Sequence, residues 1–379
     1  MPPLHPEIDP DGLLEYSVVF TDRSLNHMSK TFQKVMNDIS ATLREVYGAD
    51  AVAIVPGGGT YAMESVARQF ARDTDALIVR NGWFSFRWSQ ILDAGGFGGR
   101  QTVMKARRTA NAPDAPFAPA PAEVVADRIR AERPGIVFAP HVETAAGVIL
   151  PDDYIATIAR AAHEVGALMV LDCIASGCVW VDMRALGIDV LISAPQKGWS
   201  STPAAGLVML SDRALARLEE TTSDSFAMDL AKWRQIMAAY EGGGHAYHAT
   251  MPTDSLRAFR DTMDEMRAFG FDALAEAQWD LGRRVRSALA ARGIASVAAP
   301  GYEAPGVVVS YTDDPDIQNG SKFAALGVQI AAGVPLQCDE GEAFRTFRIG
   351  LFGIDKLRDV DGAATRIIEA VDKVIAPRG

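Results

Sequence analysis

The sequence has few cysteines and no pattern that would direct the chain into a membrane. Its three cysteines, Cys173, Cys178 and Cys338, are too few for a disulfide framework, and none lies in a CxxC motif. No apolar run approaches the roughly 18 residues of a transmembrane helix. The first residues also lack the basic and then apolar pattern of a secretion signal. These absences predict a cytoplasmic protein with no membrane partner.

The sequence also lacks a basic patch. Asp and Glu (48) outnumber Lys and Arg (37), the formal net charge is −11, and no run of basic residues occurs. Nucleic acid is therefore not an expected partner. Hydrophobic residues make up 48% of 379 residues, which is ordinary for a soluble globular enzyme with room for two domains.

Short apolar segments separated by helix-like sequence dominate the first part of the chain. A helix is predicted over residues 28–47, because apolar residues recur there every three or four positions. Strands that are apolar at every position are buried on both faces, so the pattern predicts an α/β fold with a mostly parallel sheet between helices. The predicted strands are 51–55, 76–79, 135–140, 168–172, 190–193 and 206–210.

The pattern changes near residue 256. A long charged helix is predicted over about 256–292, followed by strands at 307–311 and 347–353 and by a final helix. This order is typical of a smaller α+β domain. We therefore predict three parts, which are an N-terminal segment (1–27), a large domain (28–255) and a small C-terminal domain (256–379).

Two charged residues that follow apolar segments suit one cofactor. Asp172 ends the run LMVLD, and Lys197 lies in SAPQKG, directly after the run VLIS. Open α/β sheets bind ligands at the carboxyl ends of their strands. Pyridoxal phosphate needs a lysine for its aldehyde and a carboxylate that keeps its ring nitrogen protonated. The sequence leaves two alternatives open, a structural Asp–Lys ion pair and an aspartate that only caps a helix or turn.

A glycine-rich turn, PGGGTYAMES (56–65), lies between a predicted strand and a predicted helix. Backbone N–H groups at such a helix start can bind a phosphate. The spacing Gly57-x-Gly59-x-x-Ala62 also fits the loose dinucleotide fingerprint, and Arg80 at the end of the next strand could bind a 2′-phosphate. An NADP-dependent oxidoreductase is therefore an alternative interpretation.

Seven motifs, in order along the chain, resemble those of the class V aminotransferases, and most closely the alanine–glyoxylate and serine–glyoxylate branch. The resemblance covers about residues 28 to 353. It implies a pyridoxal-phosphate-dependent transferase of fold type I that works as a homodimer with shared active sites. The motifs are GGGTYAMES (57–65), NGWFSFR (81–87), HVETAAGV (141–148), LDCIAS (171–176), SAPQKG (193–198), AYHATMP (246–252) and FRIGLFG (347–353).

The resemblance also implies a role for each matching residue. Lys197 would form the covalent bond to the cofactor, and Asp172 would pair with the nitrogen of its ring. Phe84 would stack on one face of the ring and Ile174 would pack on the other. Arg348 would bind the substrate's α-carboxylate, which suits a rigid two-pronged donor. Without the motif, Phe84 would more often be a core residue and Arg348 a structural ion-pair partner.

Further residues would bind the cofactor's oxygens. Thr144 would bond near the phenolic oxygen, and Tyr247 and Thr250 would reach the phosphate from the neighbouring subunit. The remaining phosphate ligands would be Gly58, Gly59, Thr60 and Gln196. The segment HAYH (245–248) has two histidines three residues apart but no third ligand at a suitable spacing, so no metal is predicted.

The chain departs from the family pattern at its start. Residues 5–16, HPEIDPDGLLEY, lack the GPGP-type turn of other members, in a segment that commonly borders the substrate. Cys338 precedes Arg348 by ten residues, which suggests a cysteine desulfurase or related lyase of the same fold as an alternative. Those enzymes usually have a histidine where this chain has Gln196. Trp199 either lines the substrate pocket or packs against it.

Together these patterns predict an aminotransferase. It would move an amino group from a small amino acid, alanine- or serine-like, to a 2-oxo acid such as glyoxylate or pyruvate. The reaction would follow a ping-pong mechanism, in which the amine of Lys197 acts as general base and acid at the substrate's α-carbon.

Overall fold

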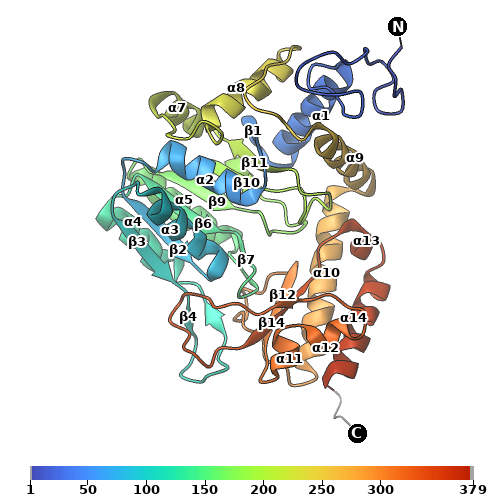
Figure 1. Cartoon of the computed structure of the whole chain (residues 1–379). Coiled ribbons are helices and arrows are strands. Elements are labelled where there is room, and N and C mark those ends of the chain that lie inside the picture. Colours follow the sequence, from blue (N-terminus) through green and yellow to red (C-terminus); the bar gives the residue numbers. More distant parts are fainter. Residues whose placement is uncertain (1, 376–379) are drawn as a thin grey trace.

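The computed structural model describes residues 2–375, and its large part is built on a seven-stranded sheet (Figure 1). The strand order is β1-β11-β10-β9-β6-β2-β3. Strand β11 is antiparallel to both of its neighbours, and the other pairings are parallel, which confirms the predicted sheet. In that order the strands are Ala51–Pro56, Ala205–Leu210, Val190–Ser193, Leu168–Asp172, Ile136–Pro140, Ala76–Arg80 and Gln101–Lys105.

Helices lie on both faces of this sheet (Figure 1). Every residue of β2, β6, β9, β10 and β11 is buried, as expected for strands covered on two sides. Helix α2 packs on α3, and α4 packs on α5. The helices of this part are α1 (Lys30–Tyr47), α2 (Gly59–Phe70), α3 (Trp83–Gly95), α4 (Ala122–Glu132), α5 (Asp152–Glu164), α6 (Met183–Leu186), α7 (Asp212–Glu220), α8 (Leu230–Glu241) and α9 (Thr253–Phe269).

The prediction of one long helix over 256–292 is wrong, because the chain forms two helices there, α9 and α10 (Phe271–Ala290). They are separated by Gly270, whose φ of 102° is a backbone conformation that residues with a side chain rarely adopt. Helix α9 packs on α1, and the Arg267 Nη1 atom lies 2.8 Å from Glu45 Oε1. The domain boundary at residue 256 stays a prediction, and this packing favours a boundary nearer Gly270.

In the C-terminal part, a three-stranded sheet packs against α10, and α10 packs in turn on α14 (Val360–Ile375). The sheet has the order β12-β14-β13, with β12 at Val307–Tyr311, β14 at Thr346–Gly350 and β13 at Ala331–Ala332. The predicted strand over 347–353 thus ends at Gly350. The short helices of this part are α11 (Pro315–Gln318), α12 (Ser321–Ala324) and α13 (Ile354–Leu357). Four short strands lie earlier in the chain, and they are β4 (Arg107–Arg108), β5 (Phe117–Ala118), β7 (Val142–Glu143) and β8 (Val148–Ile149).

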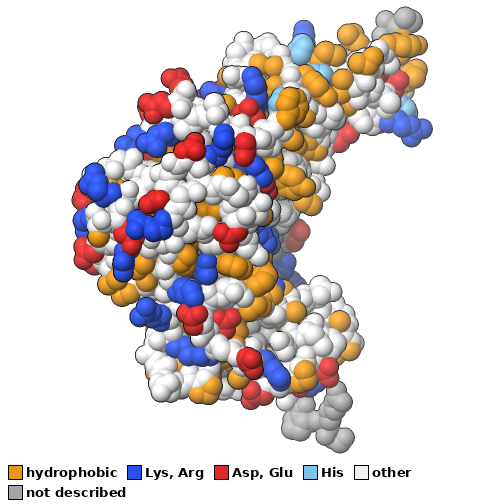
Figure 2. Space-filling view, turned by 60° about the vertical axis from the view of Figure 1, so that its left-hand side comes forward, with side chains coloured by type: hydrophobic (Ala, Val, Ile, Leu, Met, Phe, Trp, Pro, Cys, Tyr) orange, Lys and Arg blue, Asp and Glu red, His pale blue; other side chains and the backbone are white. Residues whose placement is uncertain are grey.

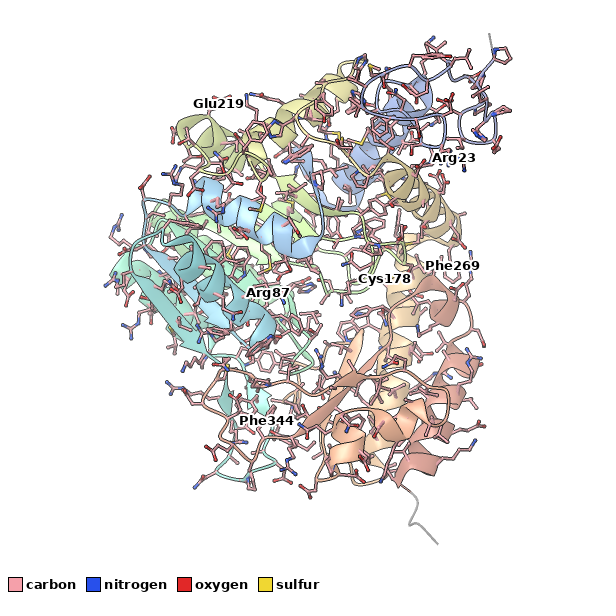
Figure 3. The ribbon with its side chains drawn as sticks, in the orientation of Figure 1. Arg23, Arg87, Cys178, Glu219, Phe269 and Phe344 are labelled. Carbon is pink, nitrogen blue, oxygen red and sulfur yellow. The ribbon has the colours of Figure 1, made fainter. Side chains whose placement is uncertain are left out.

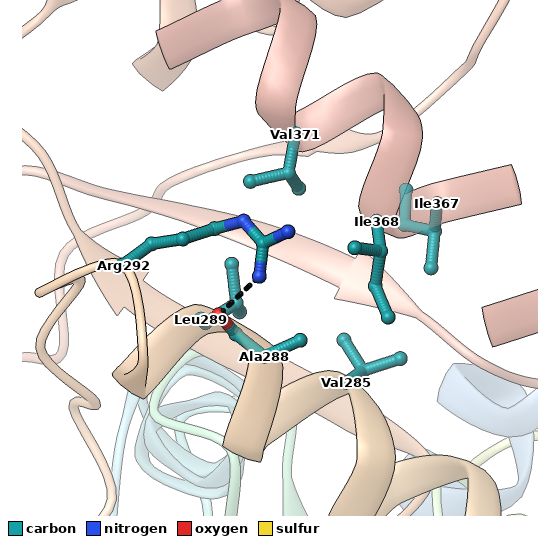
Figure 4. Close-up of a pocket in the computed structure, with 7 residues that line it drawn as sticks. All are labelled: Val285, Ala288, Leu289, Arg292, Ile367, Ile368 and Val371. Atoms are coloured by element: carbon teal, nitrogen blue, oxygen red, sulfur yellow. Dashed lines mark hydrogen bonds between the residues drawn. The ribbon is translucent and has the colours of Figure 1, made fainter. Parts of the chain in front are cut away.

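A crevice between α10 and α14 is closed by aliphatic side chains such as Val285, Leu289, Ile368 and Val371 (Figure 4). The one charged residue drawn there, Arg292, donates from its Nη1 atom to the Ala288 carbonyl at 2.8 Å. The aliphatic side chains and a second Arg292 contact, from Nη2 to Asp372 Oδ2 of α14 at 2.7 Å, hold the two helices together, so the crevice is a packing feature and not a candidate site. No helix within residues 2–375 is long and apolar enough to cross a membrane.

Candidate active site

The carboxyl ends of five strands meet at one edge of the large sheet, where open α/β sheets bind ligands. Strand β11 is antiparallel to both β1 and β10, so β1, β10, β9, β6 and β2 all run in one direction. The segments that leave these strands bring most of the predicted residues to this edge. They are Gly58, Gly59 and Thr60 after β1, Phe84 after β2, Thr144 after β6, Asp172 and Ile174 at the end of β9, and Gln196 and Lys197 after β10.

Asp172 is a buried carboxyl group at this edge. Its Oδ1 atom accepts a hydrogen bond from the Ile174 N–H at 2.9 Å. Burial raises the pKa of Asp172 to about 7, the Ile174 N–H opposes this rise, and the nearby charge of Glu143 adds to it. The alternative of a structural ion pair is not seen, since no Lys or Arg within residues 2–375 forms a salt bridge with Asp172. A cationic ligand group placed here would therefore be strongly favoured.

Lys197 lies in the loop after β10. Strand β10 pairs with β9, the strand that ends at Asp172. Burial lowers the pKa of Lys197, and the positive charges of Arg348 and Arg87 lower it further. Its Nζ atom is 5.7 Å from the centre of the Phe352 ring. An amine with a lowered pKa is more often neutral, and the neutral amine is the form that attacks a carbonyl group.

The glycine turn after β1 lies directly against the Asp172 segment. A Cβ atom built on Gly59 would lie 2.5 Å from Ile174 Cδ1, so any larger residue would force Ile174 to shift. The Thr60 hydroxyl accepts a hydrogen bond from Arg87 Nη1 at 2.9 Å. Gln196 has a buried atom, Oε1, with no hydrogen-bond partner among the described residues. The helix start and the Thr60 hydroxyl can donate hydrogen bonds to a phosphate group. The Gln196 Oε1 atom is an acceptor and would need a donor, so only the amide NH2 group of Gln196 could bind the phosphate.

Arg348 comes from the small sheet and meets the large part at Phe84. Its guanidinium carbon lies 5.5 Å from the centre of the Phe84 ring, and that of Arg87 lies 5.3 Å from the same centre. Figure 3 shows Arg87 on the side of the large part that faces the small part. Burial lowers the pKa of Arg348, and the charge of Glu143 opposes this. Two cations and an aromatic ring thus converge beside Lys197.

Sequence reasoning missed two residues of this site, Glu143 and Arg87. Glu143 is fully buried, and its carboxylate accepts hydrogen bonds from the N–H groups of Phe84, Ser85 and Ala145. Both missed residues lie inside motifs that had been recognised, HVETAAGV and NGWFSFR. The available signal was a lone acidic residue within the mostly apolar segment HVETAAGV, next to Thr144.

Tyr247 and Thr250 lie apart from the residues just described. Their hydroxyl groups are 3.1 Å from each other, and Tyr247 is 53% exposed. The Tyr247 ring packs beside His27, with ring centres 5.5 Å apart. Within the same segment, His248 Nε2 donates to the Phe226 carbonyl at 2.7 Å. Their predicted contact with the phosphate of a neighbouring subunit stays a prediction.

Trp199 is a core residue. It is 1% exposed, and its Nε1 atom donates to the Tyr47 hydroxyl at 3.2 Å. Its ring also lies against the rings of Trp180, Phe259 and Phe271. Of the two positions that the sequence left open for Trp199, the structure therefore favours packing behind the lysine loop.

Arg80 suggested an NADP-dependent oxidoreductase and Cys338 a cysteine desulfurase. In the structure the two residues lie close together, and both are buried. Arg80 donates to Ser89 Oγ at 2.8 Å and to the Gln337 carbonyl at 3.4 Å, and it is 8% exposed, so its guanidinium is buried and not open to a 2′-phosphate. The Cys338 thiol lies 3.3 Å from the Arg80 carbonyl and is 4% exposed. Burial raises its pKa to about 12, which keeps it protonated and unreactive.

Comparison with known proteins decides the family. The family described as "Aminotransferase class-V" matches residues 13–315. The chain belongs to this family. It is a pyridoxal-phosphate-dependent transaminase, and the buried carboxyl of Asp172 and the amine of Lys197 at the sheet edge fit that cofactor.

Two relatives of this class V aminotransferase span nearly its whole length. It is 26% identical over 358 residues to "Soluble hydrogenase, small subunit" of Synechococcus sp. (strain PCC 6716), covering 94% of this chain and 88% of the other. It is 27% identical over 350 residues to "2-aminoethylphosphonate--pyruvate transaminase 2" of Paraburkholderia xenovorans (strain LB400), covering 90% and 89%.

Solved structures confirm the fold. The alanine–glyoxylate aminotransferase of Nostoc sp. matches with a TM-score of 0.77 at 22% identity, over 93% of this chain and 89% of that chain. The ureidoglycine–glyoxylate aminotransferase of Bacillus subtilis matches with a TM-score of 0.77 at 20% identity, over 95% and 88%. The predicted fold type I architecture is thereby established.

Proposed function

We propose that this class V aminotransferase moves the amino group of a small amino acid, such as alanine or serine, to a 2-oxo acid such as glyoxylate or pyruvate. The observation that carries the proposal is the meeting of Arg348 with Phe84 beside Lys197, because it joins a carboxylate-binding group to the cofactor-binding edge. The names of relatives, which include pyruvate and glyoxylate as acceptors, support these 2-oxo acids.

Each residue of the sheet edge has a separate task in this proposal. Bound pyridoxal phosphate supplies an electron sink for the bond that breaks at the substrate's α-carbon. Lys197 holds the cofactor at rest, and its neutral amine then takes the proton from the α-carbon and returns a proton in the next step. Arg348 orients the substrate through its α-carboxylate. The negative form of Asp172 stabilises the protonated ring nitrogen.

Further cofactor contacts are part of the proposal. Phe84 and Ile174 enclose the ring, and Thr144 bonds near its phenolic oxygen. The turn of Gly58, Gly59 and Thr60 binds the phosphate together with Gln196. Support comes from the start of α2, where no side chain caps the first N–H groups, and from the Thr60 hydroxyl, which accepts from Arg87 Nη1 and can still donate its own proton.

A cytoplasmic homodimer is the assembly that we propose. Large apolar side chains of the N-terminal segment are exposed, among them Leu13, Tyr16 and Val18. Figure 2 shows hydrophobic side chains gathered on the arm that this segment forms at the top right. A second copy that covers this arm would also bring Tyr247 and Thr250 toward a phosphate across the interface.

The deciding experiment is reduction of the cofactor on the protein. Purified protein mixed with pyridoxal phosphate should develop a visible absorption band, which borohydride should remove while fixing the cofactor on Lys197, as read by peptide mass spectrometry. Lys197→Ala should show neither the band nor the labelled peptide. If the wild-type protein develops no band, the proposal fails.

The substrate is identified by half-reactions of the yellow protein. Alanine, serine and 2-aminoethylphosphonate would each be mixed with it, and loss of the visible band would be followed. We expect alanine or serine to convert the band fastest, with recovery on addition of glyoxylate or pyruvate. Conversion by 2-aminoethylphosphonate alone would overturn the proposed donor class and leave the enzyme class intact.

A further inference from the structure

We propose that Glu143 is a positioning residue of this active site. Its buried carboxylate holds Phe84 in place for the cofactor ring and joins two segments of the sheet edge, the start of α3 and the segment after β6. This inference rests on the proposed function, because it assigns a purpose to a contact with the predicted ring-stacking residue. Glu143 itself would touch neither substrate nor cofactor.

The hydrogen bonds of Glu143 bind the start of α3. Its Oε1 atom accepts from the Phe84 N–H at 3.2 Å and from the Ala145 N–H at 3.0 Å. Its Oε2 atom accepts from the Ser85 N–H at 2.9 Å and from the Ser85 hydroxyl at 2.7 Å. Both oxygens are thus used twice, and hydrogen bonds to an ionised acceptor are the strong ones. The carboxylate fixes Phe84 through its backbone and not through its ring.

Gly82 leaves the space that Glu143 occupies. A Cβ atom built on Gly82 would lie 2.7 Å from both Cγ and Cδ of Glu143, which is closer than real atoms approach. The backbone of Gly82 is extended, with φ of 167°, so a larger residue is excluded by the carboxylate and not by backbone strain. The turn before α3 is therefore shaped around this one side chain.

Phe84 carries the effect of Glu143 toward the substrate side. The Phe84 ring is flanked by the guanidinium groups of Arg87 and Arg348, at 5.3 and 5.5 Å from its centre. Thr144 lies between Glu143 and Ala145, and the Ala145 N–H donates to the Glu143 carboxylate, so this hydrogen bond closes a short turn around the residue predicted to bond near the phenolic oxygen. A displacement of Glu143 would shift both cofactor contacts together. A residue that served only stability would have no such effect.

The test measures cofactor binding by the apoprotein and does not depend on turnover. Glu143→Gln keeps the shape of the side chain, but its amide nitrogen cannot accept the N–H groups. We expect the dissociation constant of pyridoxal phosphate to rise about tenfold, the effect of losing one charge-assisted hydrogen bond. We also expect the circular dichroism of the bound cofactor to weaken, because the ring is less firmly held.

Asp189→Asn is the matched control. Asp189 is also buried, precedes β10 at the opposite edge of the sheet, and accepts from the Met169 N–H at 2.8 Å and from Arg213 Nε at 3.1 Å. We expect this variant to lower the melting temperature while the cofactor dissociation constant stays within about twofold of wild type.

Gly82→Ala keeps the test decisive if Glu143→Gln does not fold. This variant retains the charge of Glu143 but pushes the carboxylate out of place, so the cofactor dissociation constant should again rise. The proposal is overturned if folded Glu143→Gln or Gly82→Ala binds the cofactor with wild-type affinity and circular dichroism. Such a result would leave the proposed function standing, whereas absence of the visible band in wild-type protein would remove both.

Discussion

Gly59 and Ile174 are in such close contact that a Cβ atom on Gly59 would lie 2.5 Å from Ile174 Cδ1. Gly59 is the first residue of α2, and Ile174 follows the end of β9, so a helix start and a strand end meet over the sheet edge. The same contact places the predicted phosphate turn against the side chain predicted to pack on the cofactor ring. One ligand would therefore be bound by two segments that also support each other.

Gly59→Ala should consequently weaken both the fold and cofactor binding. The added methyl group forces Ile174 away, which should cost about 1–3 kcal/mol of unfolding free energy and raise the cofactor dissociation constant tenfold or more. Urea unfolding and titration of the apoprotein measure the two effects. Gly244→Ala is the control, because its built Cβ meets only the Ala239 carbonyl oxygen, at 3.5 Å. Equal behaviour of the two variants would contradict the proposed cradle.

The buried carboxyl of Asp172 should make the stability of the cofactor-free protein fall as pH rises. The pKa of Asp172 is about 7 in the folded protein, whereas in the unfolded chain it is about 3.9. Between these values the folded state binds more protons than the unfolded state, so the free energy of unfolding decreases with pH.

The variant Asp172→Asn lacks the titrating carboxyl group, so it should lack this pH dependence of the free energy of unfolding. From pH 4 to pH 7, the variant should gain roughly 3–4 kcal/mol of unfolding free energy relative to wild type. Other groups, such as His141, titrate in both proteins and cancel in the comparison. Urea unfolding at several pH values tests this, and a constant difference would contradict it. Transamination should be lost in the variant, since the neutral amide cannot stabilise a protonated ring nitrogen.

The sequence alone predicted those residues of the site whose position follows from a single strand end or motif. Asp172 and Lys197 follow fully apolar strands, and such strands lie side by side in a parallel sheet, so their ends had to meet. Arg348 could be assigned only through the resemblance. Its approach to Phe84 depends on how two sheets pack, which no local pattern specifies.

Other features could not be read from local patterns. Glu143 acts on backbone N–H groups of Phe84 and Ser85, nearly 60 positions away, and such a partner leaves no trace in residue spacing. The break between α9 and α10 depends on Gly270, and one glycine inside a helical pattern is often tolerated. Strand β3, with Gln101 and Lys105 at its ends, is a half-buried edge strand and lacked the continuous apolar run of the others.

Trp199 should matter for stability and not for substrate binding. Trp199→Phe removes the indole N–H that reaches the Tyr47 hydroxyl and leaves space in the surrounding aromatic core. We expect the free energy of unfolding to fall by about 1–3 kcal/mol, with the KM of the amino donor unchanged. Trp279→Phe, at a half-buried position, is the control and should cost less. A raised KM for Trp199→Phe would return Trp199 to the substrate pocket.

Cys338 should be dispensable for catalysis. Its thiol is buried and its pKa is raised to about 12, so the reactive thiolate is scarce at neutral pH. We expect the native protein to react slowly with a thiol reagent, and Cys338→Ala to keep transamination within about twofold of wild type. Sulfide release from cysteine that disappears in Cys338→Ala would instead support a desulfurase.

Mixed dimers should show whether Tyr247 and Thr250 serve the neighbouring subunit. Lys197→Ala should be inactive alone, and the double variant Tyr247→Phe/Thr250→Ala should bind the cofactor weakly. In a dimer of one chain of each kind, one site combines an intact Lys197 with intact hydroxyl groups from the other chain. Random reassembly of equal amounts should therefore restore about a quarter of wild-type activity.

The control for this experiment mixes Lys197→Ala with Asp172→Asn. Both residues belong to the same site of the same chain, so neither site of the mixed dimer is intact and no activity should return. Recovery in the first mixture but not in the second requires that the hydroxyl groups cross the interface. If neither mixture recovers although mixed dimers have formed, Tyr247 and Thr250 act within their own chain or not at all.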